Sequence, residues 1–287
     1  MSFTFSSAVY ILLSVLTYFL IVGVISYRTS IIYKNLDVFL SQRDLFPIIL
    51  TTFGIQNLIP FPGTHWAGRS LILKKFHDIE YHKTILASSF EVVCNFFMYT
   101  LSFVIALQTS LLYVTHSKLT KAPLLVYLGL IVIGGVLGTR KIFIEWIEKF
   151  FLGSNFQKVL FFFKQITFNF YSIVALILLS AFVSFLNGLW IWLDVKIFSV
   201  DLTFIQCFSI FWIPFFLGKI SKIPLGLGVS DISMIFMLKY YGVFSSTAIH
   251  IVLFYRIFFS AITIFLALYF IFKKNYYLIF RKGDFTR

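Results

Sequence analysis

Two oppositely charged side chains, Asp231 and Arg256, lie in a strongly apolar part of the sequence and could bind a phosphate group. Asp231 follows a segment rich in proline and glycine and precedes an apolar pattern of helical spacing, so we expect it in the first turn of a helix. Arg256 lies within the apolar run that begins at His250. A helix N-terminus and a buried arginine both favour phosphate. The alternatives are a purely structural ion pair, or an aspartate that only caps its helix.

A second set of polar side chains lies earlier in the chain, at Arg69, Glu91 and Asn95. Glu91 and Asn95 are spaced i, i+4 in a long apolar run, which puts them on one face of a helix. An unpaired carboxylate in a membrane is costly, so we predict that Glu91 pairs with Arg69. The two sets together predict a substrate-binding site made of Arg69, Glu91, Asn95, Asp231 and Arg256.

Helix-breaking residues precede both charged pairs. The earlier break contains Pro62 and Gly63, and the later one contains Pro224, Gly226 and Gly228. Proline removes a backbone donor and glycine destabilises a helix, so we expect no continuous helix through either segment. Broken backbone at membrane depth is tolerated only where it is buried in protein or lines a watery cavity. Both breaks are therefore predicted to belong to the site.

The two halves of the chain share one plan, which predicts an internal repeat. In each half a short apolar segment ends in a Pro/Gly break, a brief helix with Arg69 or Asp231 follows, and a span then carries the opposite charge. The order of the charges is reversed, because Arg69 precedes Glu91 whereas Asp231 precedes Arg256. Paired interrupted segments in corresponding halves indicate a transporter binding site. The alternative is a chance likeness between two Pro-Gly turns.

The composition is typical of membrane proteins. The 287 residues are 60% apolar and 12% charged, whereas soluble domains are about half apolar and about a quarter charged. Several apolar runs are long enough to cross about 30 Å of hydrocarbon. We predict an all-α fold, a polytopic transmembrane helix bundle with two Pro/Gly-broken or re-entrant helical segments. Residues 1–287 are expected to form a single integral membrane domain.

The apolar runs give the expected spans. The first has no basic residue before it and no A-x-A cleavage pattern, so we interpret it as a retained span rather than a signal peptide. An amphipathic, charged segment, Arg140–Gln165, is expected to form an interfacial helix. Full spans are expected at Ala8–Ser26, Thr84–Tyr113, Pro123–Gly138, Phe170–Trp192 and His250–Phe272.

Charged residues mark the expected connections between spans. Arg28 begins a mixed, net basic connector after the first span. Asp194, Lys196 and Asp201 are interpreted as a short loop. The segment 45–83 is expected to be re-entrant, because basic residues lie on both of its sides.

Charge also predicts the surroundings of the chain. The net charge of +13 indicates contact with anionic lipid head groups on the cytoplasmic side. Nucleic acid is not expected as a partner, because no compact basic domain is present. The tail after Phe272 carries five Lys/Arg residues and is expected in the cytoplasm, as is the segment 139–165. The sequence thus predicts a multi-pass protein of the cytoplasmic membrane whose partners are anionic or phosphate-bearing lipids.

Common catalytic and cofactor motifs are missing. His77 and His82 flank two acidic residues without a spacing typical of a metal site. Gly226-x-Gly228 lacks the third glycine of a nucleotide-binding loop. No G-x-S-x-G and no H-E-x-x-H sequence occurs. We expect no catalytic residue, no metal and no cofactor.

At the residues of the two breaks and two spans, the chain resembles the lysylphosphatidylglycerol synthase transmembrane-domain family, whose members are flippase-like integral membrane proteins. The resemblance covers nearly the whole chain. It rests on Asn57 to Pro60 with Pro62-Gly63, on Ser89-Phe90-Glu91, on the run Pro224-Leu225-Gly226-Leu227-Gly228-Val229-Ser230-Asp231, and on Tyr255-Arg256.

The chain also departs from this family pattern. Leu225 replaces a glycine, and Asp231 stands where the family usually has glutamate. His65 and Trp66 stand where glycine and glutamate are expected, and no arginine follows Glu91. The soluble aminoacyl transferase domain of full-length synthases is absent from the 287 residues. The resemblance therefore implies lipid handling rather than lysine transfer.

Three functions follow from these features. The first is a lipid-binding transporter, not an enzyme, which flips a phospholipid or a polyprenyl-phosphate-linked sugar across the cytoplasmic membrane. The second is a membrane-embedded glycosyl or acyl transferase that uses Glu91 or Asp231 as a base. The scatter of only eleven Asp and Glu residues argues against it. The third is an accessory subunit that works with envelope-biosynthesis enzymes in an envelope-polymer pathway.

Overall fold

The protein is built from helices wherever its structure is described. The computed structural model describes residues 5–59, 64–115, 169–221, 223 and 226–276, and no strand occurs among them. The elements are α1 (Phe5–Lys34), α2 (Gln42–Leu58), α3 (Thr64–His77), α4 (Tyr81–Thr115), α8 (Phe170–Ile197), α9 (Phe204–Ile220), α10 (Val229–Tyr240), α11 (Ser245–Leu253), the π-helix η2 (Phe254–Phe258) and α12 (Phe259–Lys273).

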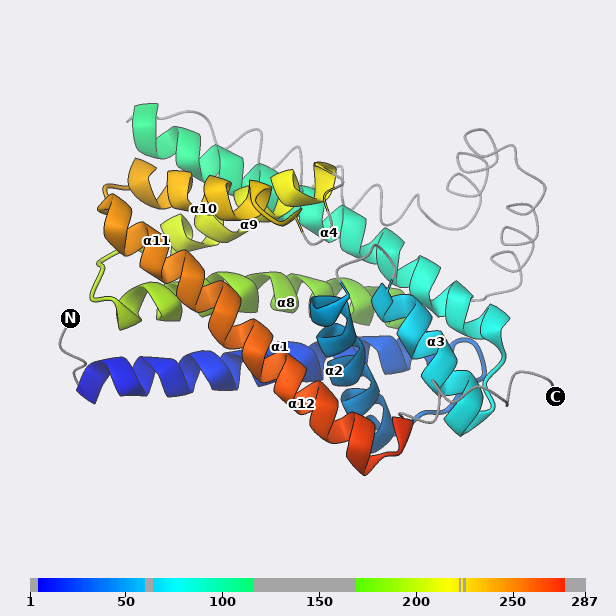
Figure 1. Ribbon diagram of the computed structural model, residues 1–287. Helices are drawn as coiled ribbons and strands as arrows, with labels where there is room; N and C mark the ends of the chain where they lie inside the picture. The colour runs from blue at the N-terminus through cyan, green and yellow to red at the C-terminus, as the bar shows by residue number, and fades with distance from the viewer. Residues whose placement is uncertain (1–4, 60–63, 116–168, 222, 224–225, 277–287) are drawn as a thin grey trace.

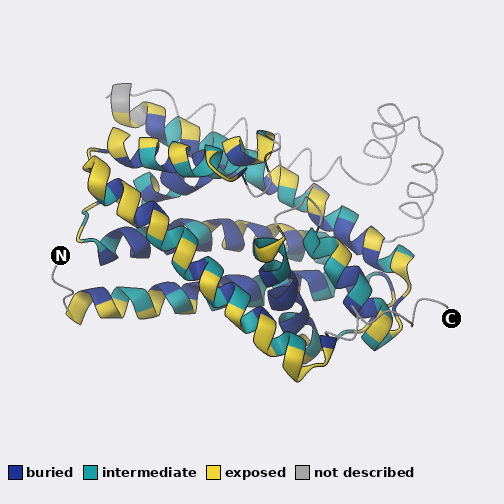
Figure 2. Ribbon diagram, in the orientation of Figure 1, coloured by how far each residue is buried: buried dark blue, intermediate teal, exposed yellow. Residues whose placement is uncertain are grey.

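Four helical segments of the described chain are long and apolar enough to cross a membrane, namely Phe5–Lys34, Tyr81–Leu111, Tyr171–Ile197 and Ser245–Lys273. The chain is therefore a multi-pass membrane protein, and the predicted all-α polytopic bundle is confirmed. Exposed residues recur along α1 and α12 (Figure 2). Many of them are large and apolar, Leu16, Leu20 and Phe265 among them, as expected for helices that face lipid.

Two long antiparallel helices, α1 and α8, pack along each other through the middle of the molecule (Figure 1). At one end, the hydroxyl of Ser7 donates to the carbonyl of Ile197. Further along, Nη1 of Arg28 donates to the hydroxyl of Ser180 at 3.0 Å. Polar side chains therefore join these helices at several depths.

The pairs of short helices form two hairpins that enter the bundle from opposite ends (Figure 1). The first hairpin is α2–α3. Gln42, at the start of α2, donates to Ser30 near the end of α1, and Phe76 of α3 packs on Tyr276 beyond α12. The second hairpin is α9–α10, where the hydroxyls of Tyr241 and Ser110 lie 2.7 Å apart beside the far end of α4.

Each half of the chain packs a short helix against a long helix of the other half. The first half runs α1 (long), α2 and α3 (short), α4 (long), and the second runs α8, α9, α10, then the long unit α11–η2–α12. The first helix of each hairpin packs against the long helix of the other half, so that α2 lies against α12 and α9 against α4. This order and this crosswise packing match what an internal repeat predicts.

Two loop predictions are wrong. Arg28 was expected in a connector, but α1 continues to Lys34, and Arg28 is a buried residue of this helix. Asp194 and Lys196 were expected in a loop, but both belong to α8, and the Asp194 side chain is fully buried. For Arg28 and for Asp194, a hydroxyl on another helix hydrogen-bonds to the charged group, which allows that group to lie inside the bundle. The predicted span Pro123–Gly138 and the interfacial helix Arg140–Gln165 lie outside the described residues.

Candidate functional site

A buried ion pair joins the first hairpin to α4. Nη2 of Arg69 lies 2.7 Å from Oε2 of Glu91, and Nη1 lies 3.0 Å from Oε1. The two side chains are only 2% and 3% exposed. Arg69 also donates to Ser88, and Glu91 accepts a hydrogen bond from Thr29 of α1. The predicted pairing is confirmed. These hydrogen bonds link α3, α4 and α1 and leave the pair buried.

Arg28 is a second buried cation near this pair, and the sequence reasoning missed it. Its charge interacts with the Glu91 carboxylate, so two arginines share one acid. Among the described residues, Nε of Arg28, Nε of Arg69 and the hydroxyl of Tyr33 are buried without a hydrogen-bond partner. The available signal was the absence of proline and glycine between Gly23 and Lys34, which allows α1 to continue through Arg28.

Asn95 does not join the Arg69–Glu91 pair. It lies one turn further along α4, half-buried, and its side chain makes no hydrogen bond within the described part of the chain. Its predicted role in substrate binding therefore rests on its position alone.

A second ion pair, between Asp231 and Arg256, joins the second hairpin to the last long helix. Nε of Arg256 lies 2.8 Å from Oδ1 of Asp231, and Nη2 lies 3.3 Å from Oδ2. Nη2 also donates to the hydroxyl of Ser230 at 2.9 Å. Unlike the first pair, these side chains are 27% and 26% exposed. The structure thus brings these two predicted residues together where a ligand can reach them.

Local backbone geometry presents this second pair. Asp231 lies in the first turn of α10, where its carboxylate accepts the backbone N–H of Gly228 at 3.1 Å and caps the helix. Arg256 lies in η2, and π-turns of this kind are frequent at functional sites. Asp231 is therefore held at the start of an α-helix, directly after the turn, and Arg256 is held by a π-helical turn.

Glycines close the turn of the second hairpin. Gly226 has φ +65° and Gly228 has φ +81°, a region that L side chains rarely adopt. A Cβ on Gly226 would lie 2.9 Å from the Cα of Gly218, so the turn folds tightly against α9. This explains two of the predicted helix-breaking residues. Pro62, Gly63 and Pro224 lie outside the described residues.

The start of α3 and the end of α9 bring charged side chains of the two halves within reach of each other. His65, at the start of α3, interacts electrostatically with Arg69, Glu91 and Lys219, and Lys219 lies at the end of α9. Gly54 of α2 packs so closely on α12 that an added Cβ would lie 2.2 Å from Cβ of Ala267. Charges from both halves of the chain therefore interact around His65.

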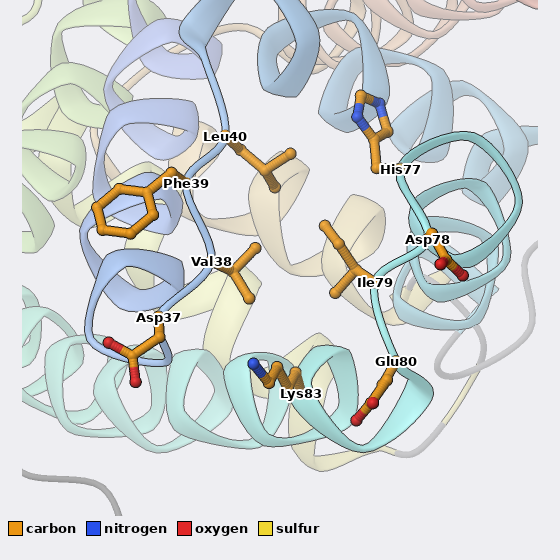
Figure 3. Close-up of a pocket in the computed structure, with 9 residues that line it drawn as sticks. All are labelled: Asp37, Val38, Phe39, Leu40, His77, Asp78, Ile79, Glu80 and Lys83. Carbon is orange, nitrogen blue, oxygen red and sulfur yellow. The ribbon is translucent and has the colours of Figure 1, made fainter.

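A pocket of about 330 Å³ lies apart from these groups, where the α1–α2 and α3–α4 connections meet (Figure 3). Its walls include Asp37, Phe39 and Lys83, but none of the predicted site residues. Two acids beside it are already engaged, because Asp78 pairs with Lys74 at 2.8 Å and Glu80 pairs with His82 at 2.9 Å. The hydrogen bond and charge of Lys74 lower the pKa of Asp78. We assign no role to this pocket.

Comparison with known proteins gives one family. The family model described as the lysylphosphatidylglycerol synthase TM region matches residues 3–267. No curated protein and no solved structure matches the chain.

Proposed function

The chain belongs to the family of the lysylphosphatidylglycerol synthase TM region, and we propose that it binds a phosphate-bearing lipid between its two hairpins and flips it across the membrane. The family indicates a membrane protein of lipid or envelope pathways. The observation that carries the finer proposal is the partly exposed Asp231–Arg256 pair at the start of α10.

The second pair offers the chemistry that a phosphate needs. A phosphate could take the place of the Asp231 carboxylate on the guanidinium of Arg256 and accept hydrogen bonds from Ser230 and from backbone N–H groups at the start of α10. The Arg69–Glu91 pair is closed by burial and would act as a support rather than as a first contact.

The charge around the two turns also favours an anion. Arg28 interacts with Glu91 and Lys219 interacts with His65, so these two cations add to Arg69 and Arg256, against the two carboxylates of Glu91 and Asp231. An excess of positive charge inside a membrane protein is costly unless a ligand compensates for it. A bound phosphate would supply that compensation.

Hairpins that enter from opposite ends suit a transporter. In transporters built from repeated halves, broken helices meet near the midplane and one half rocks against the other. Here each hairpin packs on the long helix of the opposite half, so that movement of one half would carry the far hairpin with it. This arrangement supports movement of lipid, rather than a transferase or an accessory role, as the proposed activity.

The test is a flipping assay in proteoliposomes with fluorescent phosphatidylglycerol and, separately, a fluorescent polyprenyl phosphate. We expect flipping by the wild type, loss in Arg256→Ala and partial retention in Arg256→Lys, because lysine keeps the charge but not the bidentate geometry. Lys239→Ala is the matched control, because Lys239 is exposed on α10 away from the pair. Wild-type flipping rates in Arg256→Ala would contradict the proposed site, and no flipping of either probe would contradict the proposed transport of these lipids.

A further inference from the structure

A buried carboxyl group that the proposed site does not use lies between α1 and α8. Asp194 is on the last turn of α8, yet its side chain is fully buried. Its Oδ1 accepts a hydrogen bond from Ser14 of α1 at 2.5 Å. Its Oδ2 is buried and has no hydrogen-bond partner within the described residues. An oxygen left in this state is a rarity in folded proteins and calls for a chemical explanation.

No cation compensates for Asp194 among the described neighbours. The titratable groups that interact with it are Cys207 of α9 and Tyr255 of η2. A thiol and a phenol are ordinarily neutral at neutral pH. The basic side chains that interact with this thiol and this phenol pair with other acids, since Lys196 pairs with Asp201 and Arg256 pairs with Asp231.

These surroundings suit a carboxylic acid rather than a carboxylate. A buried, unpaired carboxylate is so costly that such groups take up a proton instead. The protonated group can donate its O–H to Ser14, which leaves only a carbonyl oxygen without a partner. An unpartnered carbonyl oxygen is less costly than an unpartnered carboxylate oxygen. We propose that Asp194 is a proton-binding site, protonated in the packed arrangement described here, and that loss of this proton loosens the contact between α1 and α8.

The position of Asp194 gives this proton a consequence for the second ion pair. One turn before it, Trp190 packs on Tyr255 at 5.0 Å between ring centroids, and Tyr255 precedes Arg256 in η2. A charge on Asp194 would draw water into this contact and displace the ring that supports η2. Proton binding at Asp194 does not depend on the proposed lipid transport, and it is tested without it.

The experiment is an infrared titration of the purified wild-type protein from about pH 5 to about pH 9, a range in which an ordinary aspartate is ionised. We expect a protonated-carboxyl C=O band at neutral pH that is lost in Asp194→Asn and kept in Asp78→Asn, the control whose exposed carboxylate pairs with Lys74. Ser14→Ala should shift the band through loss of the hydrogen bond, which identifies it even where Asp194→Asn does not fold.

Thermal unfolding over the same range gives the second readout. The unfolding temperature of the wild type should fall as pH rises, because ionisation opposes the packed state, while that of Asp194→Asn should stay flat. Absence of the band at neutral pH in the wild type, or its persistence in Asp194→Asn, would overturn the proposal.

Discussion

At the scale of residues, the two ion pairs differ in burial, so their contributions to the free energy of unfolding should differ. Breaking a buried pair by removal of one partner typically costs about 3–5 kcal/mol. We expect Arg69→Ala and Glu91→Ala each to lower the free energy of unfolding by about that amount, because the remaining charge is buried away from water. The double variant should lose much less than the sum, as measured by a double-mutant cycle in detergent. Strict additivity would mean that the pair is not coupled.

The Asp231–Arg256 pair is a quarter exposed, so water screens it and its coupling should be nearer 1 kcal/mol, roughly the upper value for exposed pairs. Asp231→Ala and Arg256→Ala should each destabilise the protein modestly, with partial recovery in the double variant. Lipid flipping should not recover, because the cation that contacts phosphate is gone. A double variant that flips lipid at the wild-type rate would exclude this site.

At the scale of elements, two glycines of the second hairpin allow the cost of backbone strain to be separated from the cost of a steric clash of an added Cβ. Gly226→Ala meets both, since φ is positive and the new Cβ would press on Gly218. Gly228→Ala meets only strain, since nothing lies within 4 Å of its Cβ position. We expect Gly228→Ala to cost about 1–2 kcal/mol and Gly226→Ala clearly more, measured by thermal unfolding. Equal losses would mean that the hairpin turn relaxes freely.

The contact between the halves can be tested at Gly54. Gly54→Ala would place a Cβ 2.2 Å from Ala267 and 2.8 Å from the carbonyl oxygen of Thr263, which should push α2 away from α12. Overpacking of this kind costs about 1–3 kcal/mol. Adding Ala267→Gly removes one of the two clashes, so the double variant should recover part of the stability. No recovery would place the conflict at Thr263 alone.

The elements and pairs that the sequence predicted have local causes. Clusters of proline and glycine end helices, and an acid after such a cluster caps the next helix, so the position of Asp231 at a helix start and the two interrupted segments could be predicted. The pairing of Arg69 with Glu91 followed from the cost of a lone charge in a membrane. Gly54 showed no such signal, because glycine is required there by the close approach of Thr263 and Ala267, which lie far away in sequence.

What could not be predicted depends on partners distant in sequence. Arg28 is buried by a bond to Ser180, 152 positions away. Asp194 is buried by a bond to Ser14, 180 positions away. Both residues follow a long apolar run, where a charged residue ordinarily marks the end of a span, so the sequence favoured loops.

At the scale of the whole molecule, the described basic residues gather at one end. The end where α1 and α12 finish carries Lys34, Lys74 and Lys273 among others, whereas the opposite end carries Lys196 and Lys239. By the positive-inside rule we expect this first end to face the cytoplasm. The open end of the second hairpin, near Asp201, is then expected to face outward.

Thiol labelling in intact cells tests this orientation. Asp201 is 97% exposed and Asp78 is 92% exposed, so cysteines there should react freely wherever reagent can reach them. A membrane-impermeant reagent should label Asp201→Cys in intact cells and Asp78→Cys only after permeabilisation. The parent chain is the control, because Cys207 is buried and Cys94 is partly covered. The reverse pattern would invert the topology.

The crosswise packing of the halves also has a consequence for biosynthesis. The helix α2 begins at Gln42, but the helix that covers it begins at Phe259. Chains are made at about 5–20 residues per second, so α2 waits on the order of ten seconds or more for its partner. During that interval its inner face must be shielded by the insertion machinery or by lipid. A nascent chain arrested before Phe259 would therefore be an unfinished substrate for quality control, and not a smaller working protein.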